Sequence, residues 1–317
     1  MKLIPSFFRL IRWPNLVFIA LTQILFYYCI ILPSLSAGYN LHPYKLTSGI
    51  FYLLVLASVL IAAAGYIIND YFDINIDQVN KPHKMIVQKI IKRRWAIFWH
   101  LFLTAAGLAV SLFVSLHTSF IIFIANIVCA LLLWVYSTTF KKKLLSGNII
   151  ISGLTAWTVM VLYVATNPVF SRIPQLTAGM QPGMQRIYKF AALYAGFAFI
   201  ISLVREVIKD IEDMEGDTRY GCKTMPIVWG VPAAKVFVGV WLVVLIGALA
   251  VVQFYVLQIG WWISSLYVLF LVILPLILVL KKFYEAQSVV QYHQLSTHVK
   301  WVMLTGIMSM LLFKMYA

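Results

Sequence analysis

The chain has 317 residues, of which 62% are hydrophobic and only 11% are charged, and its mean hydropathy is +0.91. Because soluble domains are about 25% charged, this composition excludes a soluble globular enzyme, a disordered chain and a disulfide scaffold. A net charge of +15 would suggest nucleic-acid binding in a soluble protein. Here the basic residues lie between apolar segments, which indicates a membrane protein with no nucleic-acid partner.

Apolar segments of about 20 residues are long enough to cross a bilayer as helices. Nine such segments predict an all-α, polytopic membrane bundle that forms a single domain over residues 1–317. In chain order they are 14–35, 46–69, 95–116, 118–138, 147–166, 188–208, 233–256, 262–280 and 297–316. The first segment is too long for the apolar core of a signal peptide and lacks a small-residue cleavage site, so we expect it to remain as a span.

The distribution of basic residues predicts the orientation of these spans. If the N-terminus is cytoplasmic, 20 of the 25 Lys and Arg residues fall on the cytoplasmic side. Cytoplasmic loops carry an excess of Lys and Arg. We therefore expect a multi-pass protein of the cell inner membrane, with the N-terminus inside and the C-terminus outside.

Nine of the ten acidic residues occupy two short windows that follow the second and sixth spans. Three aspartates in each window stand at i, i+3 and i+7, which places them on one face of a helix. They are Asp70, Asp73 and Asp77 in the first window and Asp210, Asp213 and Asp217 in the second. The windows are offset by 140 residues at all three positions, which predicts two pseudo-repeated four-helix halves plus a ninth helix.

Three carboxylates on one helix face repel each other and are stable together when a cation lies between them. Carboxylate oxygens are hard ligands that suit Mg²⁺ or Mn²⁺, and Mg²⁺ is typically held by one or two carboxylates together with a substrate phosphate. The count of basic residues puts both windows on the cytoplasmic side. The two windows therefore predict a metal-bridged diphosphate site that faces the cytoplasm.

Basic residues stand near both windows and are candidates for binding phosphate. Lysine binds phosphate as a point charge and arginine as a fork. The candidates are Lys81, Lys84, Lys141, Arg205 and Lys209. We interpret the more distant group of Lys89, Lys92, Arg93 and Arg94 as topology determinants only.

The motifs resemble those of the UbiA-type intramembrane prenyltransferase family over essentially the whole chain. The first acidic window reads NDxxDxxxD, and the second reads DxxDxxxD. Weaker matches are Arg12-Trp13-Pro14-Asn15 at the start of the first span, Tyr136-Ser137 with Lys141, and Gly147-Asn148.

The resemblance implies Mg²⁺-dependent transfer of a prenyl group from an allylic isoprenyl diphosphate to an acceptor. It implies metal binding by Asn69, Asp70, Asp73, Asp77, Asp210, Asp213 and Asp217, of which Asp73, Asp77, Asp210 and Asp213 are the expected catalytic residues. The expected substrate-binding residues are Asn15, Asn69, Asp70, Lys81, Lys84, Tyr136, Lys141, Arg205, Lys209 and Asp217. Tyr71, Phe72 and Tyr136 are candidates for an aromatic wall around the allylic cation.

No residue pattern in the sequence identifies the acceptor directly. The string REVIKDIEDMEGD is most similar to the digeranylgeranylglyceryl phosphate synthase branch, which implies a geranylgeranylglyceryl phosphate-type lipid. The alternative is an aromatic acceptor, such as a quinone, tocopherol or chlorophyll-type precursor. The loop Lys84-Met85-Ile86-Val87-Gln88 lacks the proline and glycine usual in the family. A transporter is disfavoured, because it would place charges near mid-span.

Overall fold

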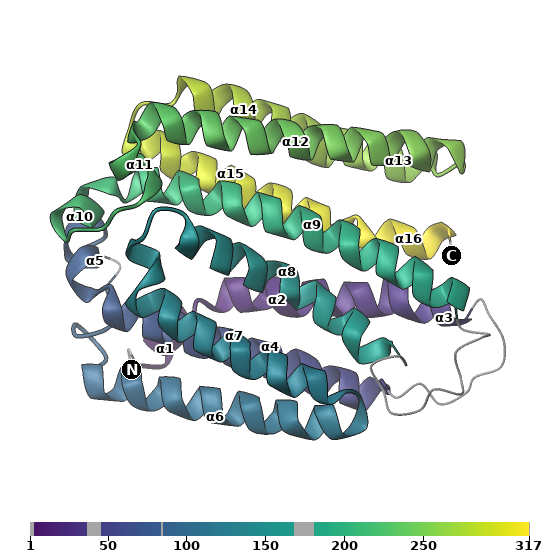
Figure 1. Cartoon of the computed structure of the whole chain (residues 1–317), viewed down its shortest axis with the longest axis horizontal. Coiled ribbons are helices and arrows are strands. Elements are labelled where there is room, and N and C mark those ends of the chain that lie inside the picture. Colours follow the sequence, from purple (N-terminus) through teal and green to yellow (C-terminus); the bar gives the residue numbers. More distant parts are fainter. Residues whose placement is uncertain (1–2, 37–45, 84, 168–180, 317) are drawn as a thin grey trace.

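The computed structural model describes residues 3–36, 46–83, 85–167 and 181–316. In these ranges the secondary structure is helical apart from one isolated bridge between Val87 and Ile91 (Figure 1). Nine helical segments of the described chain are long and apolar enough to cross a membrane, which confirms the predicted fold class. They are Trp13–Leu35, Ser48–Phe72, Arg93–His117, Phe120–Thr138, Ser146–Thr166, Pro182–Glu212, Gly230–Gln258, Trp262–Glu285 and Val289–Tyr316.

Two spans extend well beyond the predicted boundaries. The sixth begins earlier and continues through Arg205 and Glu206 to Glu212, and the ninth begins at Val289 rather than at residue 297. The charged residues Arg205, Glu206 and Lys300 interrupt the apolar pattern but not the helices. They are only partly exposed and find polar partners inside the bundle, so the helix can continue past them.

The helices are labelled in chain order. The first part of the chain contains α1 (Leu3–Leu10), α2 (Trp13–Phe26), α3 (Leu32–Ser36), α4 (Ser48–Phe72), α5 (Ile74–Asn80), α6 (Arg93–His117) and α7 (Phe120–Thr138). The rest contains α8 (Ser146–Thr166), α9 (Gln181–Glu212), α10 (Met214–Arg219), α11 (Met225–Val228), α12 (Gly230–Gln258), α13 (Trp262–Val268), α14 (Leu274–Glu285), α15 (Val289–Met308) and α16 (Met310–Tyr316).

Two spans contain a π-helical turn, at Tyr27–Ile31 and at Leu269–Ile273. In each case a proline, Pro33 or Pro275, follows two residues after the turn. Proline lacks an N–H and its ring clashes with the carbonyl four residues earlier. The wider turn absorbs this conflict, so each span continues past its proline.

The long helices run roughly side by side, and the short helices α5 and α10 lie together at one end of the bundle (Figure 1). The N-terminal helix α1 is at this same end, whereas the C-terminus is at the other. Helix α4 packs on α2, α6 and α7, and α9 packs on α8, α12 and α15. The two acidic windows therefore lie at one end of the bundle, as their positions in the sequence predicted.

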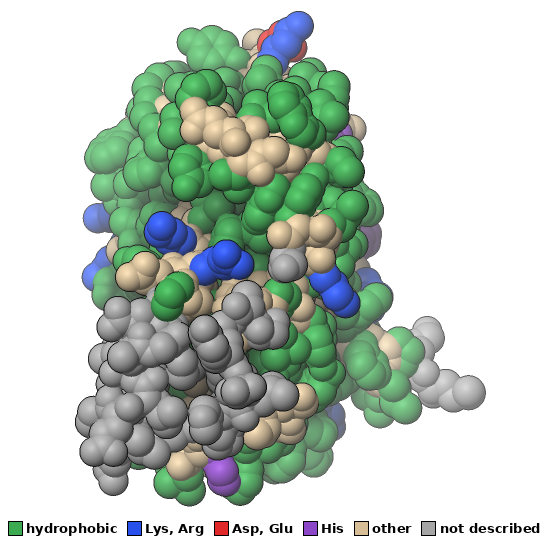
Figure 2. Space-filling view, turned by 90° about the vertical axis from the view of Figure 1, so that its right-hand side faces the viewer, with side chains coloured by type: hydrophobic (Ala, Val, Ile, Leu, Met, Phe, Trp, Pro, Cys, Tyr) green, Lys and Arg blue, Asp and Glu red, His purple; other side chains and the backbone are tan. Residues whose placement is uncertain are grey.

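The outer surface of the spans is apolar. On α6 and α12, for example, Phe102 is 53% exposed and Val251 is 71% exposed. Figure 2 shows the end that bears the C-terminus, where hydrophobic side chains dominate and basic side chains are scattered among them. Large apolar side chains exposed around a whole bundle fit contact with lipid. This surface and the nine spans identify a multi-pass integral membrane protein.

Candidate active site

Each acidic window contains a helix break at its middle aspartate. Helix α4 ends at Phe72 and α5 begins at Ile74, with Asp73 between them; α9 ends at Glu212 and α10 begins at Met214, with Asp213 between them. The backbone hydrogen bonds nevertheless continue across both breaks. The Asp77 N–H donates to Asp73 O at 2.8 Å and the Asp217 N–H donates to Asp213 O at 3.2 Å. The aspartates thus keep the common face that their spacing predicted.

The short helices α5 and α10 are joined by Asn80. Its Nδ2 donates to Asp213 O at 2.8 Å, and its Oδ1 accepts from the Gly216 N–H at 2.8 Å. A Cβ atom at residue 216 would lie 2.5 Å from Asn80 Oδ1, so a larger residue there would displace the Asn80 side chain. Helix α5 ends at Asn80 because Pro82 disfavours the helical conformation of the residue before it. Asn80 therefore fixes one motif against the other.

The loop after α10 connects the second motif with the loop that carries Lys141. Gly221 has a φ of +71°, a conformation that glycine adopts without strain. The chain then reverses, and the Cys222 N–H donates to Asp217 O at 2.9 Å. The next residue, Lys223, donates its N–H to Lys142 O at 2.8 Å. These bonds position Lys141 beside the aspartates.

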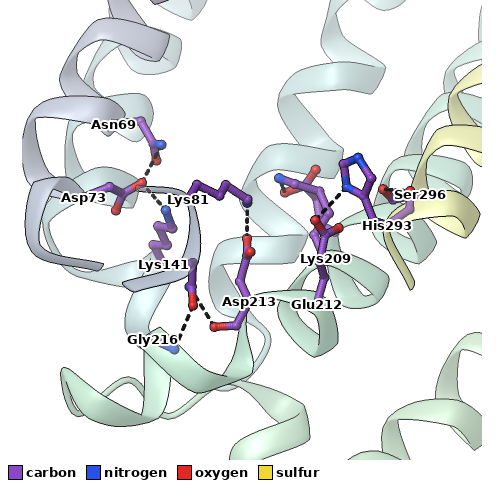
Figure 3. Close-up of polar contacts among 12 residues, drawn as sticks. Asn69, Asp73, Lys81, Lys141, Lys209, Glu212, Asp213, Gly216, His293 and Ser296 are labelled. Atoms are coloured by element: carbon purple, nitrogen blue, oxygen red, sulfur yellow. Dashed lines mark hydrogen bonds and ion pairs between the residues drawn. The ribbon is translucent and has the colours of Figure 1, made fainter. Parts of the chain in front are cut away.

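The middle aspartates are held by a crossed pair of lysines (Figure 3). Lys81, which follows the first motif, contacts Asp213 Oδ2 of the second motif at 2.6 Å. Lys141 contacts Asp73 Oδ2 of the first motif. The same Asp73 oxygen accepts from Asn69 Nδ2 at 2.7 Å. Both lysines are thus held at the point where the two motifs meet.

The last aspartate of each motif has a raised pKa. Burial, together with the negative charge of Asp73, raises the pKa of Asp77 to about 6. Burial likewise raises the pKa of Asp217 to about 6, although Lys141 acts in the opposite direction. Burial lowers the pKa of Lys141, but the negative charges of Asp73 and Asp77 and the contact with Asp73 act together to hold the pKa above its ordinary value. A bound cation would therefore help Asp77 and Asp217 to ionise.

In the described residues, no group of three His, Cys, Asp or Glu side chains is close enough to hold a metal ion. The lysines instead contact the aspartates directly. One buried oxygen nevertheless fits a cation: Asn69 Oδ1 has no hydrogen-bond partner within the described chain and lies beside Asp73. Amide and carboxylate oxygens are the donors that Mg²⁺ and Mn²⁺ prefer. The donor set therefore suits the metal that the sequence predicted, once the lysines turn away.

A cavity of about 760 Å³ joins this polar end to the apolar interior of the bundle. Its lining includes Asp210 and Tyr194 on α9, which are sixteen residues apart and so about 24 Å apart along the helix. Deep in the bundle the walls are mostly apolar and aromatic, with Trp157, Phe197 and Met310 among them. The cavity thus has a charged end and a long apolar interior.

The expected metal-binding and substrate-binding residues that the structure describes all border this cavity. The lining includes Asn15, Asn69, Asp70, Asp73, Asp77, Lys81, Tyr136, Lys141, Arg205, Lys209, Asp210, Asp213 and Asp217. Lys84 lies outside the described residues. The first aspartate of each motif has its own partner: Asp70 contacts Arg12 at 2.6 Å, and Asp210 accepts from Asn148 Nδ2 at 2.7 Å.

The predicted aromatic wall is only partly correct. Tyr136 borders the cavity, but Tyr71 and Phe72 are absent from its lining. The Arg93 guanidinium lies 4.9 Å from the Tyr71 ring centroid, and Phe72 is 37% exposed beside Trp134. Both side chains leave the helix on faces turned away from the aspartates, which explains the error.

Sequence reasoning missed several polar residues of the cavity. Glu206 on α9 contacts Arg205 at 3.0 Å and Lys209 at 3.3 Å. On α15, His293 contacts Glu212 at 2.8 Å, and Lys300 Nζ donates to Asn15 Oδ1 at 2.7 Å. For Lys300 the signal in the sequence is a lysine within an apolar span, but this pattern is equally typical of a side chain that reaches for the membrane surface.

Known proteins resemble this chain along most of its length. The model of the UbiA prenyltransferase family matches residues 17–303. The digeranylgeranylglyceryl phosphate synthase of Thermococcus gammatolerans is 34% identical over 181 residues, which cover 57% of this chain and 57% of that protein. The synthase of Hyperthermus butylicus is 31% identical over 236 residues, covering 74% of this chain and 70% of that protein. With several Thermococcus relatives, the alignment spans only 56–57% of their length.

Solved structures share the fold over almost the whole chain. One, from a study of digeranylgeranylglyceryl phosphate synthase in membranes, is 25% identical with a TM-score of 0.61 and covers 98% of this chain and 99% of its own. Another is a UbiA homologue from Archaeoglobus fulgidus bound to DMAPP and Mg²⁺. It is 15% identical with a TM-score of 0.56, covers 96% of this chain and 99% of its own, and shows the fold alone.

Proposed function

Because the chain belongs to the UbiA prenyltransferase family, we propose that it transfers a prenyl group from an allylic isoprenyl diphosphate to a lipid acceptor, with Mg²⁺ as cofactor. The observation that carries this proposal is the cavity, which joins six aspartates and four lysines to a long apolar interior. A diphosphate head on an isoprenoid tail has the same division into charged and apolar parts. Mn²⁺ is a possible substitute for Mg²⁺.

The diphosphate is bound between the two motifs. Asn69, Asp73, Asp77, Asp213 and Asp217 would hold the divalent cations, which neutralise the leaving diphosphate when bound. Lys81 and Lys141 release their aspartates and donate to diphosphate oxygens. Asp70 and Asp210 orient the site through Arg12 and Asn148. The motifs thus stabilise the negative charge that develops as the allylic C–O bond breaks.

The prenyl group is transferred as an allylic cation or a species close to it. The electron pair of the broken bond stays on the diphosphate. The acceptor hydroxyl oxygen supplies the pair for the new C–O bond, and its proton passes to the released diphosphate. Such a cation survives only where water is excluded. The apolar walls exclude water from the cavity, and the face of the Tyr136 ring can stabilise the positive charge.

We further propose that the acceptor is a geranylgeranylglyceryl phosphate-type lipid. The matching relatives named digeranylgeranylglyceryl phosphate synthase support this choice, as does the supply of cations around the motifs. An aromatic acceptor is the alternative within the same family. The excess of basic residues on the side of the motifs supports an active site that faces the cytoplasm.

The test is a competition assay with the purified full chain, Mg²⁺ and labelled geranylgeranyl diphosphate. Geranylgeranylglyceryl phosphate competes at equal concentration with 4-hydroxybenzoate, homogentisate and a dihydroxynaphthoate. We expect the label on the glycerol lipid, and no product in excess chelator. Label on an aromatic ring alone would contradict the acceptor, and absence of any product would contradict the proposed function.

A further inference from the structure

Four basic side chains border the cavity on the side formed by α2, α9 and α15, and we call this group the cationic side. It consists of Arg12, Arg205, Lys209 and Lys300. Two carboxylates contact it: Asp70 pairs with Arg12 at 2.6 Å, and Glu206 contacts Arg205 at 3.0 Å and Lys209 at 3.3 Å. Four cations therefore share two carboxylates.

Lys300 is the member without an acidic partner. Its Nζ donates to Asn15 Oδ1 at 2.7 Å, and within the described residues no carboxylate lies at ion-pair distance from it. Arg12 and Arg205 both repel its ammonium group. Partly buried charges of one sign are unfavourable together unless an anion joins them.

A second observation points to a missing anion. Arg205 Nε is buried and has no hydrogen-bond partner in the described part of the chain. A buried N–H without a partner costs about 1–3 kcal/mol, so a ligand oxygen that accepts from it would be favoured. This donor belongs to the same group of charges as Lys300.

The cationic side is distinct from the crossed lysine pairs. In Figure 3, Asp73 with Lys141 and Asp213 with Lys81 lie together, whereas Lys209 lies further along beside Glu212, His293 and Ser296. The two places also differ in charge. Where the two motifs meet, four aspartates outnumber two lysines: Asp73, Asp77, Asp213 and Asp217 against Lys81 and Lys141. This region therefore favours bound cations, whereas the cationic side favours a bound anion.

We propose that Lys300, with Arg12 and Arg205, binds the phosphomonoester of the acceptor lipid; this inference rests on the proposed function and assigns its acceptor to a separate subsite. A phosphomonoester carries about −1.5 to −2 charges at neutral pH, so it supplies the acidic partner that Lys300 lacks and an acceptor for the Arg205 Nε hydrogen. Arginine forks and a lysine ammonium are its usual partners. The Lys300 ammonium also lies 5.2 Å from the ring centroid of Phe18, so the subsite adjoins apolar surface for the lipid chain.

The test measures binding without catalysis. The full chain is reconstituted in nanodiscs of zwitterionic lipid with excess chelator, so that the aspartate motifs hold no metal-bound diphosphate. The probes are geranylgeranylglyceryl phosphate, the same lipid without phosphate, and inorganic phosphate. We expect the phosphorylated lipid to bind at least tenfold more tightly than either of the other two.

Lys300→Met should lose about tenfold in affinity for the phosphorylated lipid, as expected for one charge-assisted hydrogen bond, and should bind the lipid alcohol unchanged. Lys300→Arg should keep most of the affinity. Lys314→Met is the matched control, because Lys314 is an exposed lysine on the same span that does not border the cavity. If Lys300→Met does not fold, Lys300→Gln replaces it, since its amide can still donate to Asn15.

Equal affinity of wild type and Lys300→Met for the phosphorylated lipid would overturn the inference, and so would an equal loss for both lipids. Equally tight binding of inorganic phosphate would also overturn it. The proposed function is judged separately. If the phosphorylated lipid binds through its phosphate but no prenyl group is transferred, the acceptor subsite is supported and the proposed function is contradicted. If the wild-type protein transfers the prenyl group but Lys300→Met raises the KM of the diphosphate donor and not that of the acceptor, the proposed function is supported and the acceptor subsite is contradicted.

Discussion

The two aspartate motifs share one spacing but have different neighbours. Four residues before the middle aspartate, the first motif has Asn69 and the second has Lys209. Asn69 donates to Asp73 and leaves a buried oxygen without a partner in the described chain. Lys209 instead contacts Glu206; it precedes the second motif directly and is not one of the three residues assigned to the acceptor phosphate.

This difference indicates that the two motifs have different binding roles, although their aspartates share one spacing. An amide oxygen beside a carboxylate adds a ligand for a hard cation. A lysine in the same position repels a cation and attracts phosphate. We therefore expect the first motif to dominate metal affinity and the second motif to contribute more to binding the diphosphate itself.

The largest expected effect follows from removing the middle aspartates. Asp73→Asn should lower transfer by about 10²–10³-fold and weaken metal affinity, whereas Asp213→Asn should lower transfer with a smaller change in metal affinity. Steady-state rates across a Mg²⁺ titration measure both quantities. The control is Glu215→Gln, since Glu215 is an exposed acid of the second window that does not border the cavity. Identical metal titrations for the two aspartate variants would contradict these different binding roles.

The pH dependence of metal affinity should report the last aspartate of each motif. Because burial raises the pKa values of Asp77 and Asp217 to about 6, each carboxyl must lose a proton to bind a cation below that pH. Metal affinity should rise by up to about tenfold per pH unit for each carboxyl as the pH increases from 5 to 6, and should level off above 7. Isothermal titration at a series of pH values measures this, and Asp77→Asn should flatten the curve.

The same pKa values predict the opposite trend for stability in chelator. The folded carboxyls keep their protons up to about pH 6, whereas the ordinary value of 3.8 applies when the chain unfolds. Between these values the folded state binds more protons, so stability should fall as the pH rises. A melting temperature in chelator that rises from pH 4 to pH 6 would contradict the raised pKa values of Asp77 and Asp217.

Smaller effects should separate Asn69 from Lys209. Asn69→Leu should weaken metal affinity by about tenfold, with a smaller change in the KM of the donor. Lys209→Met should raise the KM of the donor by about tenfold and leave metal affinity nearly unchanged. Kinetics with varied Mg²⁺ and varied donor distinguish the two. If both variants change the same parameter, the motifs are equivalent despite their neighbours.

The smallest effect concerns the contact that holds the motifs together. Asn80→Ala removes two hydrogen bonds between α5 and α10 and should destabilise the protein by about 1 kcal/mol. Thermal unfolding in detergent measures the loss. Asn75→Ala on the exposed face of α5 is the matched control and should be close to neutral. Equal melting temperatures for the two variants would show that Asn80 does not fix the motifs.

Local properties of the chain determined much of the architecture. Runs of about 20 apolar residues must form helices in a membrane, since their backbone groups have no other partners there. This constraint gave all nine spans in the described chain and placed both motifs at one end of the bundle. The i, i+3, i+7 spacing also held across the breaks at Asp73 and Asp213, because the hydrogen bonds continue through them.

Partners that are far apart in the sequence came only from the tertiary structure. Lys81 contacts Asp213 and Lys141 contacts Asp73, although their order in the chain gives no reason for this crossing. Lys300 lies 285 positions from Asn15, yet the two side chains meet because α15 packs on α2. The sequence by itself determined which residues form spans and which carry charge, because both are local properties. Packing between helices decided which charges face each other, since that depends on the rotation and tilt of each helix against its neighbours.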